Sequence, residues 1–496
     1  MTFRNTLLSG TALGIAALYG VPAAAQTAAP SQAQLQSQID DLSQQLEDLK
    51  VRLGSQIGQV QKAQAEAPIV TLANGRPTIA TQDGRFSIAL RGRFHYDAGL
   101  YFQQDLSEPN DQRNARDLSS GTNFRRAELG VEGFVFRDWF YNLNYQFGGS
   151  GAEDAGKVKE AYIQYRGIKP LRITIGAYQE PLTMEDSTSS NEILFMERPE
   201  ITNVITDQLG GEGRSVVGAQ ANGENWFTSH YLVGTTVTTA ATFDEQLGYA
   251  GRAAYSRPFM DGDARVHAGV SGGYLFAPSQ TRNPTTAVTT ADHGVQLRDR
   301  PMLRVDGTRL IDTGSLNAQN LYAIGGELAG NWKNVYVQGE YYAIQVDREL
   351  VNVASVSGVK ARNTFSGGYV QASWVLTGET RQYKMDSATY GSPKVAEPFS
   401  LSSGSLGALE LKARYSYITL NDNEGEPGTA IATGAVRGGE EQIMGVGLNW
   451  YPNNNIRVMV DYLNVNVDRL GTFNGVNGQQ VGQDYNVLGI RTQFAF

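Results

Sequence analysis

Apolar and more polar residues alternate along the stretch Asp484-Tyr-Asn-Val-Leu-Gly-Ile-Arg-Thr-Gln-Phe-Ala-Phe496. One face of a strand drawn through it carries Leu488, Ile490, Phe494 and Phe496, and the other carries Val487, Gly489, Arg491 and Gln493. An apolar face backed by a more polar one is typical of a strand with lipid outside and water inside. We therefore expect this stretch to be the closing strand of a transmembrane β-barrel.

The same period of two recurs along most of the chain. Sixteen such runs begin near residues 85, 123, 139, 158, 171, 215, 226, 248, 265, 321, 335, 364, 407, 442, 456 and 485. An even number is expected of a bacterial single-chain barrel, and short connections alternate with long ones, as periplasmic turns alternate with extracellular loops. One connection breaks the rule, because residues 377–406 should form a short turn but number thirty.

Composition excludes several classes of protein. Mean hydropathy is −0.33, whereas a helical membrane protein needs runs of about 20 apolar residues. The chain has no cysteine and a net charge of −9, which argues against disulfides, thiolate chemistry and nucleic acid as a partner. The four histidines lie in no catalytic or metal-binding motif. We therefore expect neither an enzyme nor a cofactor.

The N-terminal part divides into three segments. Residues 1–25 predict a secretory signal peptide, with Arg4, an apolar run and a small-residue cleavage site; a retained transmembrane anchor is the alternative. Residues 26–66 predict a short periplasmic coiled coil, or else an amphipathic helix lying on the barrel. Residues 67–84 are expected to be a linker before the barrel at 85–496. The apolar positions of the coiled coil are Leu35, Ile39, Leu42, Leu46, Leu49 and Leu53.

Strand parity also predicts which charged side chains enter the barrel. A barrel of this size encloses water rather than a packed core, and arginine suits an anion path because its planar fork stays charged. Pairing of each basic residue with inward glutamates is the alternative. The predicted pore-lining basic residues are Arg91, Arg93, Arg126, Arg172, Arg252, Lys412, Arg414 and Arg491.

Five short stretches point to a family. They are Phe124-Arg-Arg-Ala127, Phe195-Met-Glu-Arg-Pro199, Gly378-Glu-Thr-Arg-Gln-Tyr383, Gly407-Ala-Leu-Glu-Leu-Lys-Ala-Arg-Tyr-Ser416 and Trp450-Tyr-Pro-Asn453. In order and spacing the chain resembles the porin O/porin P family, the phosphate-selective porins, over nearly all of residues 85–496. The resemblance implies a sixteen-stranded trimeric barrel and an anion channel for phosphate or polyphosphate, lined by arginines and lysines. The long link before residue 407 is similar to the family's.

Two departures from the family pattern bear on selectivity. Gln179 stands where the family usually has a lysine before Glu-Pro, and the third long loop, which folds into the pore in this family, is acidic. Facing an arginine wall, this loop predicts a transverse field and a weak or moderate anion preference. The expected acidic residues of the constriction are Glu180, Glu185, Asp186, Glu192 and Glu197.

These observations predict an outer-membrane porin of a Gram-negative bacterium, assembled as a homotrimer. It would form a passive aqueous channel for small hydrophilic solutes and anions, with phosphate or polyphosphate as candidate solutes. Expected partners are outer-membrane lipid, the barrel-assembly machinery through Phe496, and peptidoglycan. In an alternative function, the coiled coil tethers the outer membrane to the cell wall and the barrel serves as its anchor.

Overall fold

A computed structural model describes residues 31–73, 75–103, 113–149, 156–237, 243–280, 293–349 and 360–496. The chain divides into two compact units, Met1–Ala67 and Pro68–Phe496. The predicted signal peptide, residues 1–25, lies outside the described residues.

The first unit contains one long helix, α1 (Gln32–Glu66). Ser31 caps it, because the Ser31 hydroxyl accepts a hydrogen bond from the Gln34 amide at 3.4 Å and the Gln34 side chain accepts from the Ser31 amide at 3.0 Å. The apolar stripe is exposed, from 45% at Leu35 to 68% at Leu49. No helix in the described ranges is long and apolar enough to cross a membrane. The coiled coil stays a prediction, since it requires further chains.

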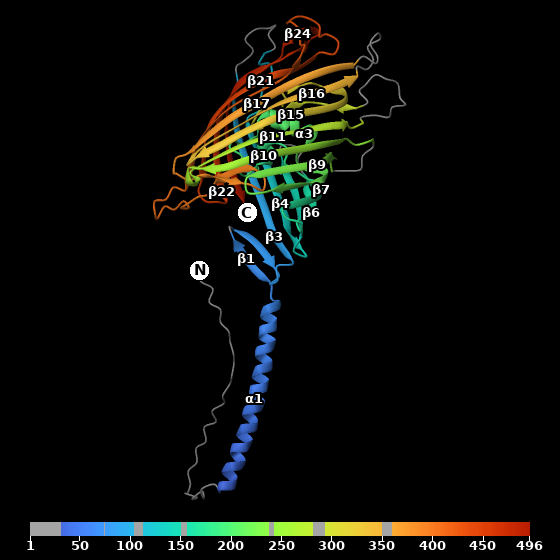
Figure 1. The fold of residues 1–496 in the computed structure, drawn as a ribbon. Helices are drawn as coiled ribbons and strands as arrows, with labels where there is room; N and C mark the ends of the chain where they lie inside the picture. Colours follow the sequence, from blue (N-terminus) through green and yellow to red (C-terminus); the bar gives the residue numbers. More distant parts are fainter. Residues whose placement is uncertain are drawn as a thin grey trace. The chain divides into compact units, whose positions relative to one another are not determined.

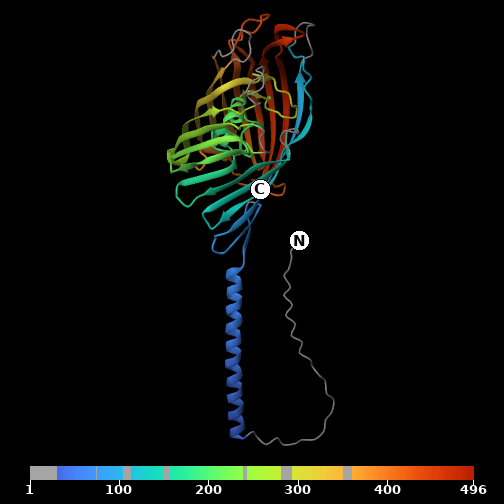
Figure 2. The same ribbon diagram turned by 90° about the vertical axis from the view of Figure 1, so that its right-hand side faces the viewer.

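The second unit is a closed antiparallel β-barrel of sixteen strands (Figures 1 and 2). The strands are β3 (Ser87–Gln103), β4 (Gly121–Val135), β5 (Trp139–Gly149), β6 (Lys157–Tyr165), β7 (Leu171–Tyr178), β8 (Arg214–Asn222), β9 (Trp226–Thr236), β10 (Leu247–Phe259), β11 (Ala264–Ala277), β15 (Leu316–Trp332), β16 (Val335–Glu349), β17 (Lys360–Val375), β20 (Ala408–Asp422), β21 (Val436–Tyr451), β22 (Ile456–Asp468) and β25 (Gln483–Ala495). Each pairs with the next, and β25 closes the ring on β3, with Gly489 opposite Gly99. The predicted fold and strand number are confirmed.

Two small elements, a 3-10 helix and a β-hairpin, lie in the connections between barrel strands. The 3-10 helix η1 (Met260–Gly262) joins β10 to β11, and the hairpin of β23 (Leu470–Phe473) and β24 (Val476–Gln480) lies within the last long loop. The short and long connections alternate as predicted, apart from the link between β17 and β20. This alternation gives the barrel a short-turn end and a long-loop end.

Residues 67–84, expected to be a linker, contain the hairpin of β1 (Ile69–Ala73) and β2 (Arg76–Ala80). Gly75 supplies the turn with φ of +74°, a conformation that glycine adopts without steric cost. Strand β2 pairs with β3, Thr78 lying opposite Ala89. The segment therefore extends the sheet before the first barrel strand rather than forming a free linker.

The interior of the barrel differs from the uniformly hollow, wet lumen that parity predicts. Near the long-loop end, inward positions carry buried apolar side chains, among them Val346, Leu420 and Val467. They belong to one apolar core that also includes residues of two loops folded into the barrel. Water is therefore excluded from part of the lumen, because apolar side chains of the loops pack against apolar side chains of the wall.

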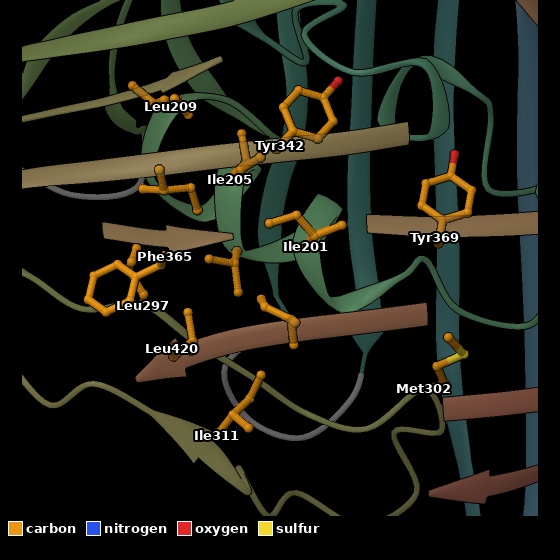
Figure 3. Packing of buried hydrophobic residues seen from close by; sticks show 14 of the residues in the cluster. Ile201, Ile205, Leu209, Leu297, Met302, Ile311, Tyr342, Phe365, Tyr369 and Leu420 are labelled. Carbon is orange, nitrogen blue, oxygen red and sulfur yellow. The ribbon is translucent and has the colours of Figure 1, made fainter. Parts of the chain in front are cut away.

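The first of these loops, residues 179–213, carries α2 (Met184–Ser187) and α3 (Glu200–Leu209). The second lies between β11 and β15 and carries β12 (Gly294–Val295), β13 (Arg298–Asp299) and β14 (Ile311–Asp312). Figure 3 shows Ile201, Ile205 and Leu209 of α3 gathered with Leu297 and Ile311 of the second loop. Burial of each such side chain stabilises the arrangement by roughly 1.5–3 kcal/mol.

Candidate functional site

A third element fills the lumen from the short-turn end. Residues 377–406 form the hairpin of β18 (Arg381–Lys384) and β19 (Thr389–Pro393). The Arg381 guanidinium donates to the Glu410 carboxylate at 2.7 Å, and the Arg252 guanidinium donates to the Ala388 carbonyl at 2.7 Å. The connection between β17 and β20, which is too long for the alternation of short and long loops, is thus an element inside the lumen. Charged contacts to β10 and β20 hold it there.

Four of the predicted pore-lining basic residues are buried in contacts that hold these inserted elements. Arg252 pairs with Glu327 at 2.8 Å, and Arg491 pairs with Asp97 at 2.6 Å and with Glu197 at 2.8 Å. The other two are Lys412 and Arg414. The Lys412 ammonium pairs with Asp461 and donates to the Leu194 carbonyl at 3.0 Å, and Arg414 pairs with Glu185 at 3.2 Å. A buried ion pair of this kind fixes geometry, since breaking it leaves an uncompensated charge.

The other four predicted basic residues lie nearer the open part of the lumen. Arg91 pairs with Glu132 at 3.2 Å and with Glu160 at 3.4 Å. Arg93 donates to the Ser190 hydroxyl at 2.6 Å and lies 3.6 Å from Glu128. Arg126 pairs with Glu212 at 2.8 Å, and Arg172, at the short-turn end, lies 3.5 Å from Asp386.

The five acidic residues expected in the constriction do not form one group, because most of them contact different partners. Glu185 reaches Arg414, Glu192 pairs with Lys384 at 2.6 Å, and Glu197 pairs with Arg125 at 2.6 Å and with Arg491. Asp186 accepts from the Gln179 side chain at 2.8 Å. Neither carboxylate oxygen of Glu180 has a hydrogen-bond partner among the described residues, and burial raises the pKa of Glu180 well above its usual value. Much of the expected transverse field is therefore replaced by direct ion pairs between loop and wall.

Among the described residues, three adjoining cavities remain open in the lumen, of about 1030, 720 and 1190 Å³ when the solvent at their mouths is included. The outer cavity lies toward the long-loop end, the middle cavity lies between the loop 179–213 and the wall formed by β3 to β8, and the inner cavity lies toward the short-turn end. Arg126 lines the outer cavity, whereas Arg91 and Arg93 line both the middle and the inner ones. The cavities together follow one side of the barrel from end to end.

The outer cavity is strongly basic. Nine basic residues line it, against the four acidic residues Asp186, Asp207, Glu212 and Asp299. The basic residues are Arg125, Arg126, Lys157, Arg198, Arg214, Arg298, Arg300, Arg304 and Arg309. Such a surplus attracts anions, and the planar guanidinium groups suit the oxygens of carboxylate or phosphate.

Sequence reasoning missed most of this basic cluster. Arg125 and Arg126 both turn inward because an irregularity in register at His95 and Tyr96 interrupts the alternation of β4. Four of the others, Arg298, Arg300, Arg304 and Arg309, belong to one long loop, where parity has no meaning. The only sequence feature that indicates this cluster is the presence of four arginines within twelve residues. In the part of the chain that the structure describes, no group of three or more histidine or acidic side chains is arranged to hold a metal.

A closed sixteen-stranded barrel with charged cavities along its lumen defines an outer-membrane channel of the porin class. The sequence matches the family described as "Phosphate-selective porin O and P" over residues 88–496. The chain therefore belongs to this family of outer-membrane channels, as its sequence resemblance predicted.

Two individual relatives match most of the chain, and one of them is named as a porin. Porin O of Pseudomonas aeruginosa is 25% identical over 435 residues, covering 82% of this chain and 90% of that protein. An uncharacterised protein of Caulobacter vibrioides is 26% identical over 444 residues, covering 87% of this chain and 78% of that protein. Neither relative supports the alternative function of a cell-wall tether.

Solved structures of porins also match. The anion-selective porin from Comamonas acidovorans has a TM-score of 0.48 and 11% identity, covering 83% of this chain and 100% of that one. The trimer form of OmpT from Vibrio cholerae has a TM-score of 0.47 and 13% identity, covering 83% of this chain and 99% of that one.

Proposed function

We propose that this porin is a passive channel for small anions and that inorganic phosphate is among its solutes. The observation that carries the proposal is the surplus of basic side chains around the outer cavity. Anions gather there before they enter the path, since fixed positive charge in a pore raises the local concentration of the opposite sign. The name of the Pseudomonas aeruginosa relative and the description of the family point to the same class of solute.

The path itself would run along one wall of the barrel. From the outer cavity, a solute would pass Ser189 and Ser190 of the loop 179–213, which face Arg93, and then reach Arg91 and Arg76 in the inner cavity. Hydroxyl and guanidinium donors replace part of the hydration shell of an oxyanion. No covalent step is involved, and the driving force is the concentration gradient.

The test is electrical recording of the purified protein in planar bilayers. In a tenfold KCl gradient, we expect a reversal potential of the sign that marks anion preference. Added phosphate should reduce the chloride current, because it competes for the basic outer cavity. Clear cation selectivity would contradict the proposal, and anion preference without phosphate block would restrict it to a general anion channel.

We also propose that the protein assembles as a homotrimer with its N-terminal segment in the periplasm. The exposed apolar stripe of α1 supports this, because such a stripe is stable in water when it packs against copies of itself. The C-terminal Phe496, whose backbone pairs with Gly92, would be the contact for the barrel-assembly machinery. Peptidoglycan is the proposed neighbour of α1.

A further inference from the structure

The outer and middle cavities adjoin at three residues that line both, Asp186, Arg198 and Glu212. Two of the three are acidic, although the outer cavity as a whole carries a large basic surplus. An anion drawn into the outer cavity therefore meets carboxylates at the entrance to the next one. This junction is the point on the path where the charge of the wall changes most.

The balance of charge confirms that change. In the middle cavity the basic residues Arg91, Arg93, Lys159 and Arg198 face the acidic residues Glu160, Asp186 and Glu212. The basic surplus thus falls from five residues in the outer cavity to one in the middle cavity. Asp186 and Glu212 account for two of the acidic residues on both sides of the junction.

The side chains at the junction are held in place. Arg198 donates to the carbonyl oxygens of Glu185 at 3.1 Å and Thr188 at 2.8 Å, and its Nε lies 3.7 Å from Oδ1 of Asp186. Glu212 is fixed by Arg126 at 2.8 Å and by the Lys159 ammonium at 2.9 Å. One carboxylate oxygen of Asp186, Oδ2, has no hydrogen-bond partner in the described part of the chain. Asp186 is therefore the less neutralised of the two carboxylates.

We propose that Asp186 and Glu212 are the specificity-determining residues of this pore and that they restrict divalent oxyanions more than monovalent anions. The inference deepens the proposed function and rests on it. Coulomb repulsion from a fixed carboxylate doubles when the charge of the permeating anion doubles. The strongly basic outer cavity thus concentrates anions of every valence, and the two carboxylates at the junction let monovalent anions pass more readily than divalent ones.

The two carboxylates differ in their response to pH. The pKa of Asp186 is raised to about 6, because burial and the charge of Glu212 raise it more than Arg198, Gln179 and Arg126 lower it. Although burial also acts on Glu212, Arg126 and Lys159 hold its pKa well below the usual value. Between pH 8 and pH 5, Asp186 therefore loses its charge and Glu212 keeps it.

The test compares sulfate with chloride, because the charges of both ions are constant from pH 5 to pH 8. In bilayers containing the full-length wild-type protein, we expect the sulfate-to-chloride permeability ratio to rise about threefold when the pH falls from 8 to 5, the factor for one unit charge at about 6 Å in water. The variant Asp186→Asn should show the higher ratio at pH 8 and little further change at pH 5. Glu212→Gln should raise the ratio at both pH values and leave a pH dependence that is shifted to lower pH, because the charge of Glu212 helps to raise the pKa of Asp186.

The matched control is Asp207→Asn, which removes the same charge from the same loop but lines the outer cavity alone. We expect it to change the ratio less than either junction variant. An Asp186→Asn channel with the wild-type pH dependence would overturn the inference, as would ratios that all three variants leave equal to wild type. In either case an anion-selective wild-type channel would leave the proposed function standing. A wild-type protein without anion preference would instead refute the proposed function itself.

Discussion

At the scale of single residues, inward arginines have two different roles. Some hold the inserted loops through buried ion pairs, and others line the open cavities. Arg491 is fully buried and binds Asp97 and Glu197, so it joins β25 to the loop 179–213. Arg91 lies on the same kind of inward position but lines the middle and inner cavities. Parity predicts that a side chain points inward, yet the inserted loops decide whether it meets water or protein.

The change Arg491→Ala should therefore act on stability. It leaves the buried carboxylates of Asp97 and Glu197 without this partner, and the expected loss is about 3–5 kcal/mol in the free energy of unfolding. Urea unfolding of the detergent-folded protein, followed by tryptophan fluorescence, measures it. The control Arg91→Ala should cost less than about 1 kcal/mol, because its ion pairs are partly exposed to water. Equal losses in the two variants would contradict the distinction.

At the scale of elements, the docking of α3 brings together carboxyl groups from separate segments. Glu200 begins α3, Asp299 belongs to β13, and Glu441 of β21 is buried near both. Burial raises the pKa of Glu200 to about 7, with Asp299 adding to it, and burial raises the pKa of Asp299 to about 6, with Arg304 opposing. Glu200 and Asp299 are therefore protonated at mildly acidic pH in the folded protein.

This arrangement predicts that α3 is held more firmly at pH 5 than at pH 8. Because the folded-state pKa values lie above the ordinary values of 4.5 and 3.8, the folded protein binds more protons than the unfolded chain from about pH 4 to 7. Their stabilising contribution is complete below that window and is lost as the pH rises through it. Amide hydrogen exchange of residues 200–209, corrected for the intrinsic pH effect, measures it. The variant Glu200→Gln should weaken the dependence, and wild-type protection that does not change with pH would contradict it.

The hairpin of β18 and β19 also makes a prediction of its own. Replacing residues 380–405 by a short turn should raise single-channel conductance about twofold or more, since an element that fills the lumen is removed. The barrel should still close, because β17 pairs with β20 without the hairpin. A control that keeps the hairpin, Lys384→Gln, removes the ion pair with Glu192 and one positive charge from the inner cavity, and should change conductance less than the deletion does. Unchanged conductance in the deletion would show that the hairpin lies off the path.

At the scale of the whole molecule, the barrel could be predicted from sequence and the contents of its lumen could not. Alternation of side chains and the sorting of loop lengths are local signals, and they predict the starts of the sixteen strands to within six residues. Residues such as Ile344 and Leu420 lie inward and are apolar, so the partners that bury them cannot be identified from their own strands. Those partners come from two separate loops of the chain, and only tertiary packing reveals them.

The apolar stripe of α1 provides a prediction about assembly. Replacing Leu42 and Leu46 by serine should lower the temperature at which the folded oligomer dissociates on a gel, because both residues lie at core positions of the predicted coiled coil. Val51 is 70% exposed on the same helix and lies off the stripe, so Val51→Ser is the matched control and should leave that temperature unchanged. Single-channel conductance should be the same in all three proteins, since the barrel forms a separate compact unit. Dissociation of the Leu42 and Leu46 variant at the wild-type temperature would show that α1 has no part in holding the copies together. A change in conductance would instead show that α1 affects the pore.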